Sequence, residues 1–364
     1  MIHKHLNYYT SHIKNDIPAG IVVFLVALPL CLGIALASGA PLFAGLIAGM
    51  GGGIIISWAS GSQLSVSGPA AGLTVIVFNA IEQLGSYYGF LVSVVLAGIL
   101  QLILGYLRAG IVGAFFPSSV IKGMLAAIGL ILIIKQIPHA VGYDVSFEGD
   151  ESYMQETAAS SFQELISSFS AISPGPALIA AVALLILILW ETPRMKRLSL
   201  VRLIPGPLIA VAWGMGFNSF ALDRFPAWSV SGKHLVSLPV TAGFDQFMQL
   251  FRLPDFSYLN NPQVYVIAAT LAIIASLETL LSLEAVDKLD PLKRIAPTNR
   301  ELKAQGVGNL ISGMIGGLPL TAVIVRSSAN INAGGKTRIS SFIHGLLLLM
   351  SVMYLTHYLN LIPL

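Results

Sequence analysis

Two ionisable residues stand inside long apolar stretches of this sequence, where a charge is costly. Glu278 lies in an apolar stretch that runs from 262 to 286, and Arg326 follows Pro319 inside a second, shorter one. A charge at the centre of a membrane helix costs at least about 2.5–3.5 kcal/mol unless it is paired or hydrated. Such residues mark ion or substrate pathways, and we expect these two to pair with each other. A purely structural ion pair is the alternative interpretation.

Two segments rich in glycine and proline interrupt the apolar stretches, one in each half of the chain. In Ser65–Thr74 a helix follows Gly68 and Pro69, and in Gly316–Gly335 a helix follows Pro319. Proline suits a helix start because that position needs no N–H donor. A helix that begins inside the membrane directs its free N–H groups and its positive dipole end at a bound anion. Paired interruptions indicate a transporter's binding site, although the first segment alone fits a small-residue packing face equally well.

The elements that must position these residues are membrane helices. Hydrophobic residues make up 55% of the 364 residues and charged residues only 10%, whereas soluble domains carry about a quarter charged residues. Inside lipid, backbone groups must form hydrogen bonds within the protein, so only helices or a closed barrel can span it. The long, continuous apolar runs of this sequence favour helices. An all-α, polytopic membrane protein is therefore predicted. Its eleven candidate spans of about 20 residues are 17–38, 41–60, 62–81, 87–107, 109–134, 174–190, 203–222, 262–286, 304–318, 319–334 and 339–359.

The positive residues orient these spans. If the N-terminus is cytoplasmic, most of the 20 Lys and Arg residues fall on the cytoplasmic side, which is the usual bias. The acidic stretch 143–173 then lies outside the cell, and so does the C-terminus. We therefore expect an integral protein of a bacterial inner membrane whose N-terminus lies in the cytoplasm.

Motifs for other kinds of chemistry are missing from the sequence. It contains no phosphate-cradling Gly-Lys-Ser/Thr loop, zinc motif, nucleophile elbow or dinucleotide fingerprint. Cys31 is the only cysteine, and the histidines show no recurring metal-ligand spacing. We therefore expect a protein that is not an enzyme, with no cofactor, no metal and no nucleic-acid partner. The lipid bilayer and a small solute are the partners that this composition favours.

Longer motifs make a family assignment possible. They are Asp16-Ile-Pro-Ala-Gly20, Ala27-Leu-Pro29, Ala37-Ser-Gly-Ala-Pro41, Ser65-Val-Ser-Gly-Pro69, Gly308-Asn-Leu310, Gly316-Gly-Leu-Pro319, Arg326-Ser and Asn330-Ile-Asn-Ala-Gly-Gly-Lys-Thr337. Together they resemble the SulP family of sulfate permeases over nearly the whole chain. The resemblance implies a seven-plus-seven inverted-repeat transporter fold with core and gate domains. It divides the chain into a first repeat at 1–222 (spans 1–7), an extracellular or interfacial connection at 223–261, and an incomplete second repeat at 262–364 (spans 8–11). The last three segments and a STAS domain would be missing.

The resemblance also implies a substrate site. In that family the anion lies between the N-termini of the third and tenth helices, flanked by the first and eighth. The matching positions here are Leu30, Ile34, Gly68, Pro69, Ala70, Ala71, Ala322, Val323, Ile324, Val325 and Arg326 for the anion, with Glu278 and Ser282 for ion coupling.

Two departures from the family pattern bear on substrate and coupling. Leu30 stands where many relatives carry Gln, which removes a polar contact to the anion. Ile324 replaces a hydroxyl residue, and Glu278 replaces the Asp of sodium-coupled bicarbonate relatives. A hard cation needs several oxygen ligands, so a co-transported proton is favoured over sodium.

The function predicted from these features is secondary active transport of sulfate, bicarbonate or a related inorganic or carboxylate anion by alternating access. Relatives are commonly dimers, which makes a homodimer the expected assembly. Three alternatives stay open: a passive anion channel on the same scaffold, a nucleobase permease-like transporter, and a membrane scaffold that only binds partners.

Overall fold

A computed structural model describes residues 2–111, 172–197, 206–230 and 247–363, together with scattered residues between these ranges. The predicted fifth span, at 109–134, and the acidic stretch 143–173 lie largely outside the described residues. The chain divides into two units, one formed by 1–122 with 241–354 and the other by 123–240 with 355–364.

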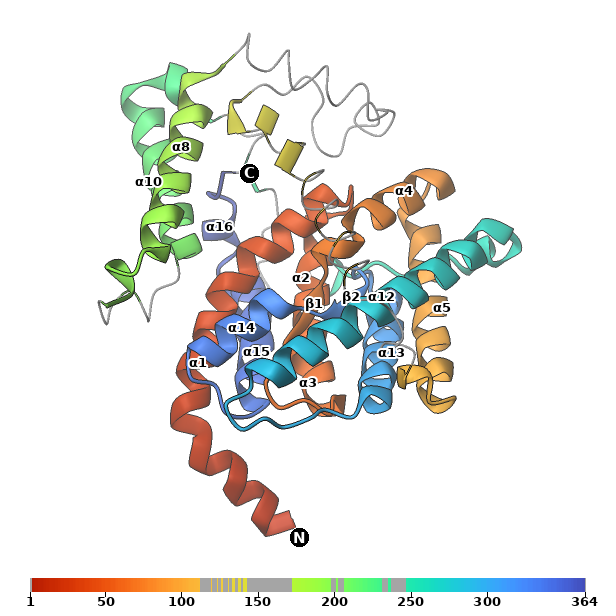
Figure 1. The fold of residues 1–364 in the computed structure, drawn as a ribbon. Helices are drawn as coiled ribbons and strands as arrows, with labels where there is room; N and C mark the ends of the chain where they lie inside the picture. The colour runs from red at the N-terminus through yellow and green to blue at the C-terminus, as the bar shows by residue number, and fades with distance from the viewer. Residues whose placement is uncertain are drawn as a thin grey trace. The chain divides into compact units, whose positions relative to one another are not determined.

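The larger unit consists of helices around two short strands (Figure 1). Both the first and the last third of the sequence contribute to it, so segments far apart in the chain form one body. Its elements are α1 (Ile2–Ala37), α2 (Leu42–Gly51), η1 (Gly52–Ile56), α3 (Ser57–Ala59), β1 (Ser67–Pro69), η2 (Ala71–Leu73), α4 (Thr74–Leu84), α5 (Tyr87–Tyr106), η8 (Phe256–Asn260), α12 (Pro262–Leu289), α13 (Thr298–Ile315), β2 (Leu320–Ala322), α14 (Ile324–Asn332) and α15 (Ile339–Tyr354).

The smaller unit is built on a pair of neighbouring helices, α8 (Pro174–Glu191) and α10 (Gly206–Arg224), which pack side by side (Figure 1). Gly175 at the start of α8 allows the backbone of Trp228 to approach, because a Cβ at Gly175 would lie 2.0 Å from the Trp228 carbonyl oxygen. The remaining described elements of this unit are η5 (Met195–Arg197), η6 (Pro226–Trp228) and α16 (Thr356–Leu359).

Five of the described helices are long and apolar enough to cross a bilayer. They are Tyr9–Ala37, Leu42–Ala59, Tyr87–Tyr106, Pro174–Glu191 and Pro262–Leu289, and each falls on a predicted span. The third and tenth predicted spans differ from a plain helix, because each begins with a strand before its helix starts. The Gly-Pro and Leu-Pro steps therefore interrupt the helices as the sequence indicates.

The two strands lie at the centre of the larger unit and pair antiparallel (Figure 1). Gly68 pairs with Thr321, and the Val323 N–H donates to the Val66 carbonyl at 2.9 Å, which extends the ladder by one bond. Backbone groups inside a membrane must find partners within the protein. The pairing satisfies the facing edges of both extended segments at once. It also fixes where two half-helices begin. The first half-helix is η2 together with α4, and the second half-helix is α14.

Corresponding elements on the two sides of the strand pair pack in the same way. Helix α1 packs against α15, as α12 packs against α5. Glycines occupy matching contacts. A Cβ at Gly98 of α5 would lie 2.5 Å from the Leu310 nitrogen of α13, and a Cβ at Gly345 of α15 would lie 2.7 Å from the Ile54 nitrogen of η1. Similar pairs of elements thus make similar close contacts on the two sides of the strand pair.

Candidate functional site

The strand pair brings the beginnings of the two half-helices to the centre of the larger unit. The first N–H groups of any helix have no intrahelical acceptor, so the start of each half-helix can donate to a group that lies there. Helix α1 packs against β1, α4 and α14, whereas α12 packs against β2, α14 and η2. The four elements predicted to surround the site, the first, third, eighth and tenth, therefore lie together.

Arg326, in the first turn of α14, is completely buried, and its three guanidinium nitrogens have no hydrogen-bond partner. Gly68 makes room for the guanidinium, because a Cβ there would lie 2.1 Å from Nη1. The Cys31 thiol lies next to the guanidinium, and His344 lies within range of its positive charge; both residues are fully buried. A buried charge without a partner costs several kcal/mol, so Arg326 does not serve to stabilise the fold.

The predicted ion pair between Glu278 and Arg326 is wrong. Among the residues that the structure describes, no carboxylate lies within 4.0 Å of the Arg326 guanidinium. The Gly72 N–H instead donates to the Glu278 carboxylate, whose Oε2 has no hydrogen-bond partner. A Cβ at Gly72 would lie 2.9 Å from both carboxylate oxygens. The positive end of the first half-helix attracts this carboxylate, which explains why Glu278 turns to Gly72 and leaves Arg326 without a counter-ion.

Ser282, the second predicted coupling residue, lies one turn beyond Glu278 on α12 and is 9% exposed. Thr279, next to Glu278, accepts a hydrogen bond of 3.3 Å from the Ala322 N–H and so holds β2. The described part of the chain contains no group of three or more His, Cys, Asp or Glu side chains that could hold a metal ion. One carboxylate and one hydroxyl suit a proton better than a hard cation, which needs several oxygen ligands.

The predicted anion-site residues fall into a buried set and an exposed set. The buried set forms the strand pair and its continuation: Gly68, Pro69, Ala70, Ala322 and Arg326. The others lie around the half-helix starts and on α1. Leu30, Ala71 and Val325 are exposed, and Ile34, Val323 and Ile324 are partly exposed. The second set is therefore open to a solute in this structure, whereas the buried set fixes the backbone and places the charge of Arg326 beside it.

Sequence analysis missed a row of polar residues on α13. Glu301, Gln305 and Asn309 recur every four residues and are at most 1% exposed. Gln305 Nε2 donates to the Ser67 hydroxyl of β1 at 2.7 Å, and Asn309 bonds to the backbone of Leu320 in β2. Residues four apart share a helix face. That spacing is the signal by which this buried polar face could have been found.

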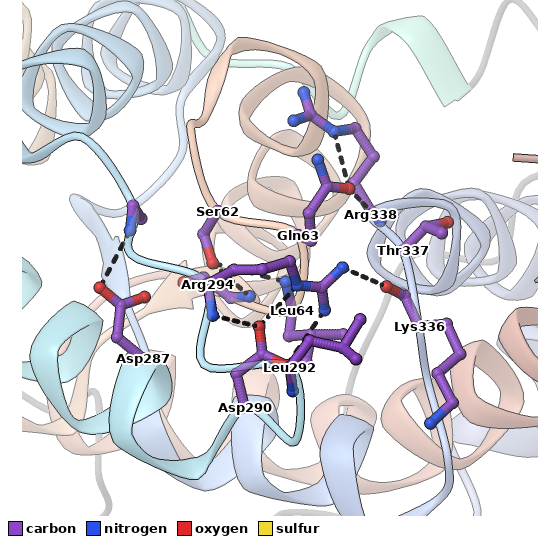
Figure 2. A network of polar contacts seen from close by, with 12 residues as sticks. Ser62, Gln63, Leu64, Asp287, Asp290, Leu292, Arg294, Lys336, Thr337 and Arg338 are labelled. Carbon is purple, nitrogen blue, oxygen red and sulfur yellow. Dashed lines mark hydrogen bonds and ion pairs between the residues drawn. The ribbon is translucent and has the colours of Figure 1, made fainter. Parts of the chain in front are cut away.

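A second polar network joins two loops at one end of the larger unit, as Figure 2 shows. Arg294 donates to Asp290 through Nε at 2.6 Å and Nη2 at 3.2 Å, and to the Lys336 carbonyl through Nη1 at 2.9 Å. Asp16 of α1 accepts from the N–H groups of Lys336 at 2.7 Å and Thr337 at 3.0 Å. These contacts fasten the loop after α12 and the loop after α14 to each other and to α1.

Comparison with known proteins identifies the family. The model of the sulfate permease family matches residues 13–364. The chain belongs to the sulfate permease family. Its members are transporters and not enzymes, as the sequence predicted.

Two curated relatives and one solved structure illustrate the similarity. The bicarbonate transporter BicA of Picosynechococcus sp. is 28% identical over 94% of this chain and 57% of that protein. The chloroplastic sulfate transporter 4.1 of Arabidopsis thaliana is 24% identical over 98% of this chain and 50% of that protein. This chain therefore spans about half the length of these relatives.

The solved structure is the transmembrane domain of a cyanobacterial bicarbonate transporter, BicA. It matches with a TM-score of 0.78 and 25% identity over 97% of this chain and 85% of that one. The prediction of an all-α, polytopic membrane transporter fold is confirmed.

Proposed function

We propose that this sulfate permease family protein is a secondary active transporter that carries a small anion across the membrane by alternating access, coupled to a proton. The observation that carries the proposal is Arg326, a completely buried arginine whose three guanidinium nitrogens have no partner. Its charge adds to the positive end of the α14 dipole, which is equivalent to about half an elementary charge. Both favour an anion at the start of the second half-helix.

Glu278 supplies a physical reason for proton coupling. Its carboxylate lies at the start of the first half-helix, where it accepts a hydrogen bond from Gly72. An ionised Glu278 repels an anion held between the two half-helices, whereas a protonated Glu278 does not. Anion binding and protonation of Glu278 therefore favour each other, and thermodynamic linkage makes this effect reciprocal. A carrier that moves both together is a proton symporter.

Sulfate and bicarbonate are the two substrates that we propose for testing. Relatives named for each ion match nearly the whole of this chain. Leu30 of α1 is 37% exposed and offers the anion no hydrogen bond. Sulfate, with its larger charge, depends more than bicarbonate on such contacts, so Leu30 should favour bicarbonate over sulfate.

The proposal includes an orientation and a division into repeats. We propose that the N-terminus lies in the cytoplasm of a bacterial cell, because most Lys and Arg residues then face inward. The network around Arg294 and Lys336 would then lie at the cytoplasmic end of the larger unit. The repeats at 1–222 and 262–364 would each supply one half-helix, and 223–261 would connect them.

The test is uptake of labelled sulfate or bicarbonate into proteoliposomes that contain the protein, with and without an inward proton gradient. We expect saturable uptake that rises with the gradient. Glu278→Gln, which cannot ionise, should keep saturable uptake and lose the gradient dependence. Glu284→Gln is the matched control, because Glu284 lies on the same helix but is exposed and pairs with Lys288 at 2.6 Å.

Two results would count against the proposal. Gradient dependence that survives in the Glu278→Gln variant would remove Glu278 from the coupling role. Absence of saturable uptake of either anion by the unmodified protein would overturn anion transport itself.

A further inference from the structure

Asn309 of α13 forms hydrogen bonds with the backbone of β2 as a neighbouring strand would. Its Oδ1 accepts from the Leu320 N–H at 2.5 Å, and its Nδ2 donates to the Leu320 carbonyl at 3.1 Å. The other edge of β2 pairs with β1. A side-chain amide carries the same donor and acceptor as a peptide group, so Asn309 completes the hydrogen bonding of β2 where no third strand exists in the described sheet.

The same amide continues into a buried chain of polar groups. Asn309 Nδ2 also donates to Gln101 Oε1 of α5 at 2.6 Å, and Gln101 Nε2 donates to the Ser276 hydroxyl of α12 at 3.2 Å. All three side chains are at most 6% exposed. Ser276 is two residues before Glu278. One chain of hydrogen bonds thus links the strand that precedes α14 to the helix that carries the carboxylate.

Gly308 makes this contact possible. A Cβ at Gly308 would lie 2.4 Å from Ile56 Cδ1 and 3.0 Å from Leu320 Cδ1. Glycine therefore lets α13 approach β2 closely enough for the amide of Asn309 to reach the strand backbone. This explains physically why glycine and asparagine stand next to each other here.

We propose that Asn309 is a positioning residue that holds the start of α14 in a set place relative to the Glu278 helix. The inference rests on the proposed function only in that the start of α14 is where the anion binds. Buried polar networks specify one arrangement when every member is satisfied, and they are costly when one member is removed. Asn309 satisfies three groups, the Leu320 N–H, the Leu320 carbonyl and the Gln101 carbonyl oxygen. Removing Asn309 leaves the Leu320 backbone and the Gln101 side chain without these hydrogen bonds.

The test compares three variants of this network with a control on the same helix. Asn309→Asp keeps the side-chain shape and the oxygen that accepts from the Leu320 N–H. Its second oxygen replaces Nδ2 and faces two acceptors, the Leu320 carbonyl and Gln101 Oε1. Asn309→Ala removes every bond, and Gln101→Ala breaks only the link to α12. Ser312→Ala is the control, because Ser312 is 2% exposed and donates at 2.7 Å to the Leu318 carbonyl, which lies outside β2.

Hydrogen exchange of residues 320–326, the KM of anion uptake and the thermal midpoint are measured for each protein. Both Asn309 variants should raise exchange and KM by about tenfold, beyond any change in Ser312→Ala. Gln101→Ala should weaken the proton-gradient dependence with a smaller change in KM. Where Asn309→Ala does not fold, the isosteric Asn309→Asp carries the comparison.

A purely structural role predicts a different pattern. It would lower the thermal midpoint and the amount of active protein, and it would leave KM and exchange at 320–326 equal to those of Ser312→Ala. That outcome would overturn the inference. Hydrogen exchange does not require a substrate, so it tests Asn309 even if the unmodified protein takes up no anion and the proposed function fails.

Discussion

Two arginines of the larger unit, Arg294 and Arg326, are used in opposite ways. Arg294 lies in a loop, and its three side-chain nitrogens donate to Asp290 and to the Lys336 carbonyl (Figure 2). Arg326 lies in α14 beside the strand pair, and none of its three has a partner. Hydrogen bonds to a carboxylate compensate the loss of water around Arg294. Arg326 has no such compensation, so its field is available to a ligand at a cost in stability.

The sharpest test of this comparison is truncation of each arginine in turn. Arg326→Ala should lower anion affinity by about 100-fold, because it removes about 3 kcal/mol of charge-assisted interaction. It should leave the thermal midpoint unchanged or raise it, because an unpaired buried charge disappears. Concentration-dependent uptake and thermal unfolding measure the two effects. Arg294→Ala is the control and should keep its anion affinity; an equal loss in both variants would break the comparison.

A smaller effect is expected when Arg326 is displaced and not removed. A Cβ added by Gly68→Ala would lie 2.1 Å from Nη1, so the guanidinium must shift. Because the charge stays nearby, anion affinity should fall by about tenfold, as loss of one well-placed contact does. Gly33→Ala is the matched control, because a Cβ at Gly33 meets nothing within 4 Å. Unchanged uptake kinetics in Gly68→Ala would show that the position of the guanidinium does not matter.

Removing the hydrogen bonds of Arg294 should lower the stability of the fold and leave anion affinity unchanged. Arg294→Ala or Asp290→Asn should lower the free energy of unfolding by about 1.5–3 kcal/mol, the range for hydrogen bonds to charged groups. Denaturant unfolding in detergent measures this change. Lys288→Ala, which removes the exposed pair with Glu284, should show no measurable change. Reduced anion affinity in the Asp290→Asn variant would contradict the purely structural role of this pair.

The smallest expected effect is the pH dependence of that pair. Partial burial alone would raise the pKa of Asp290, but hydrogen bonds from Arg294 and from the Leu292 N–H outweigh it and lower the pKa below its ordinary value of 3.8. A carboxyl whose pKa is lowered on folding stabilises the protein above its unfolded pKa, and this stability is lost as pH falls through the folded pKa. The stability difference between the unmodified protein and Asp290→Asn should therefore shrink below about pH 4. A difference that persists at low pH would exclude ionised Asp290 as its source.

Local properties of the sequence were enough to predict much of the fold. The lengths of the apolar runs gave the spans, and the Gly-Pro and Leu-Pro steps gave the two interruptions, because both features depend only on neighbouring residues. The prediction for α13 shows the limit of this reasoning. The helix begins at Thr298, six residues before the predicted span at 304, because polar residues such as Glu301 reduce the hydropathy there. The Glu301 side chain is completely buried in the protein interior, which hydropathy cannot detect.

The sequence by itself also determined which residues carry charge into the membrane, because the types and positions of Glu278 and Arg326 can be read directly. Only the tertiary structure decided what surrounds each of them. Glu278 lies at Gly72, Arg326 Nη1 lies over Gly68, and Asn309 reaches Leu320. Most of these contacts join residues about 200 or more positions apart or depend on a close approach that glycine permits. Pairing follows distance in space, and distance in space is set when the two halves of the chain pack around the strand pair.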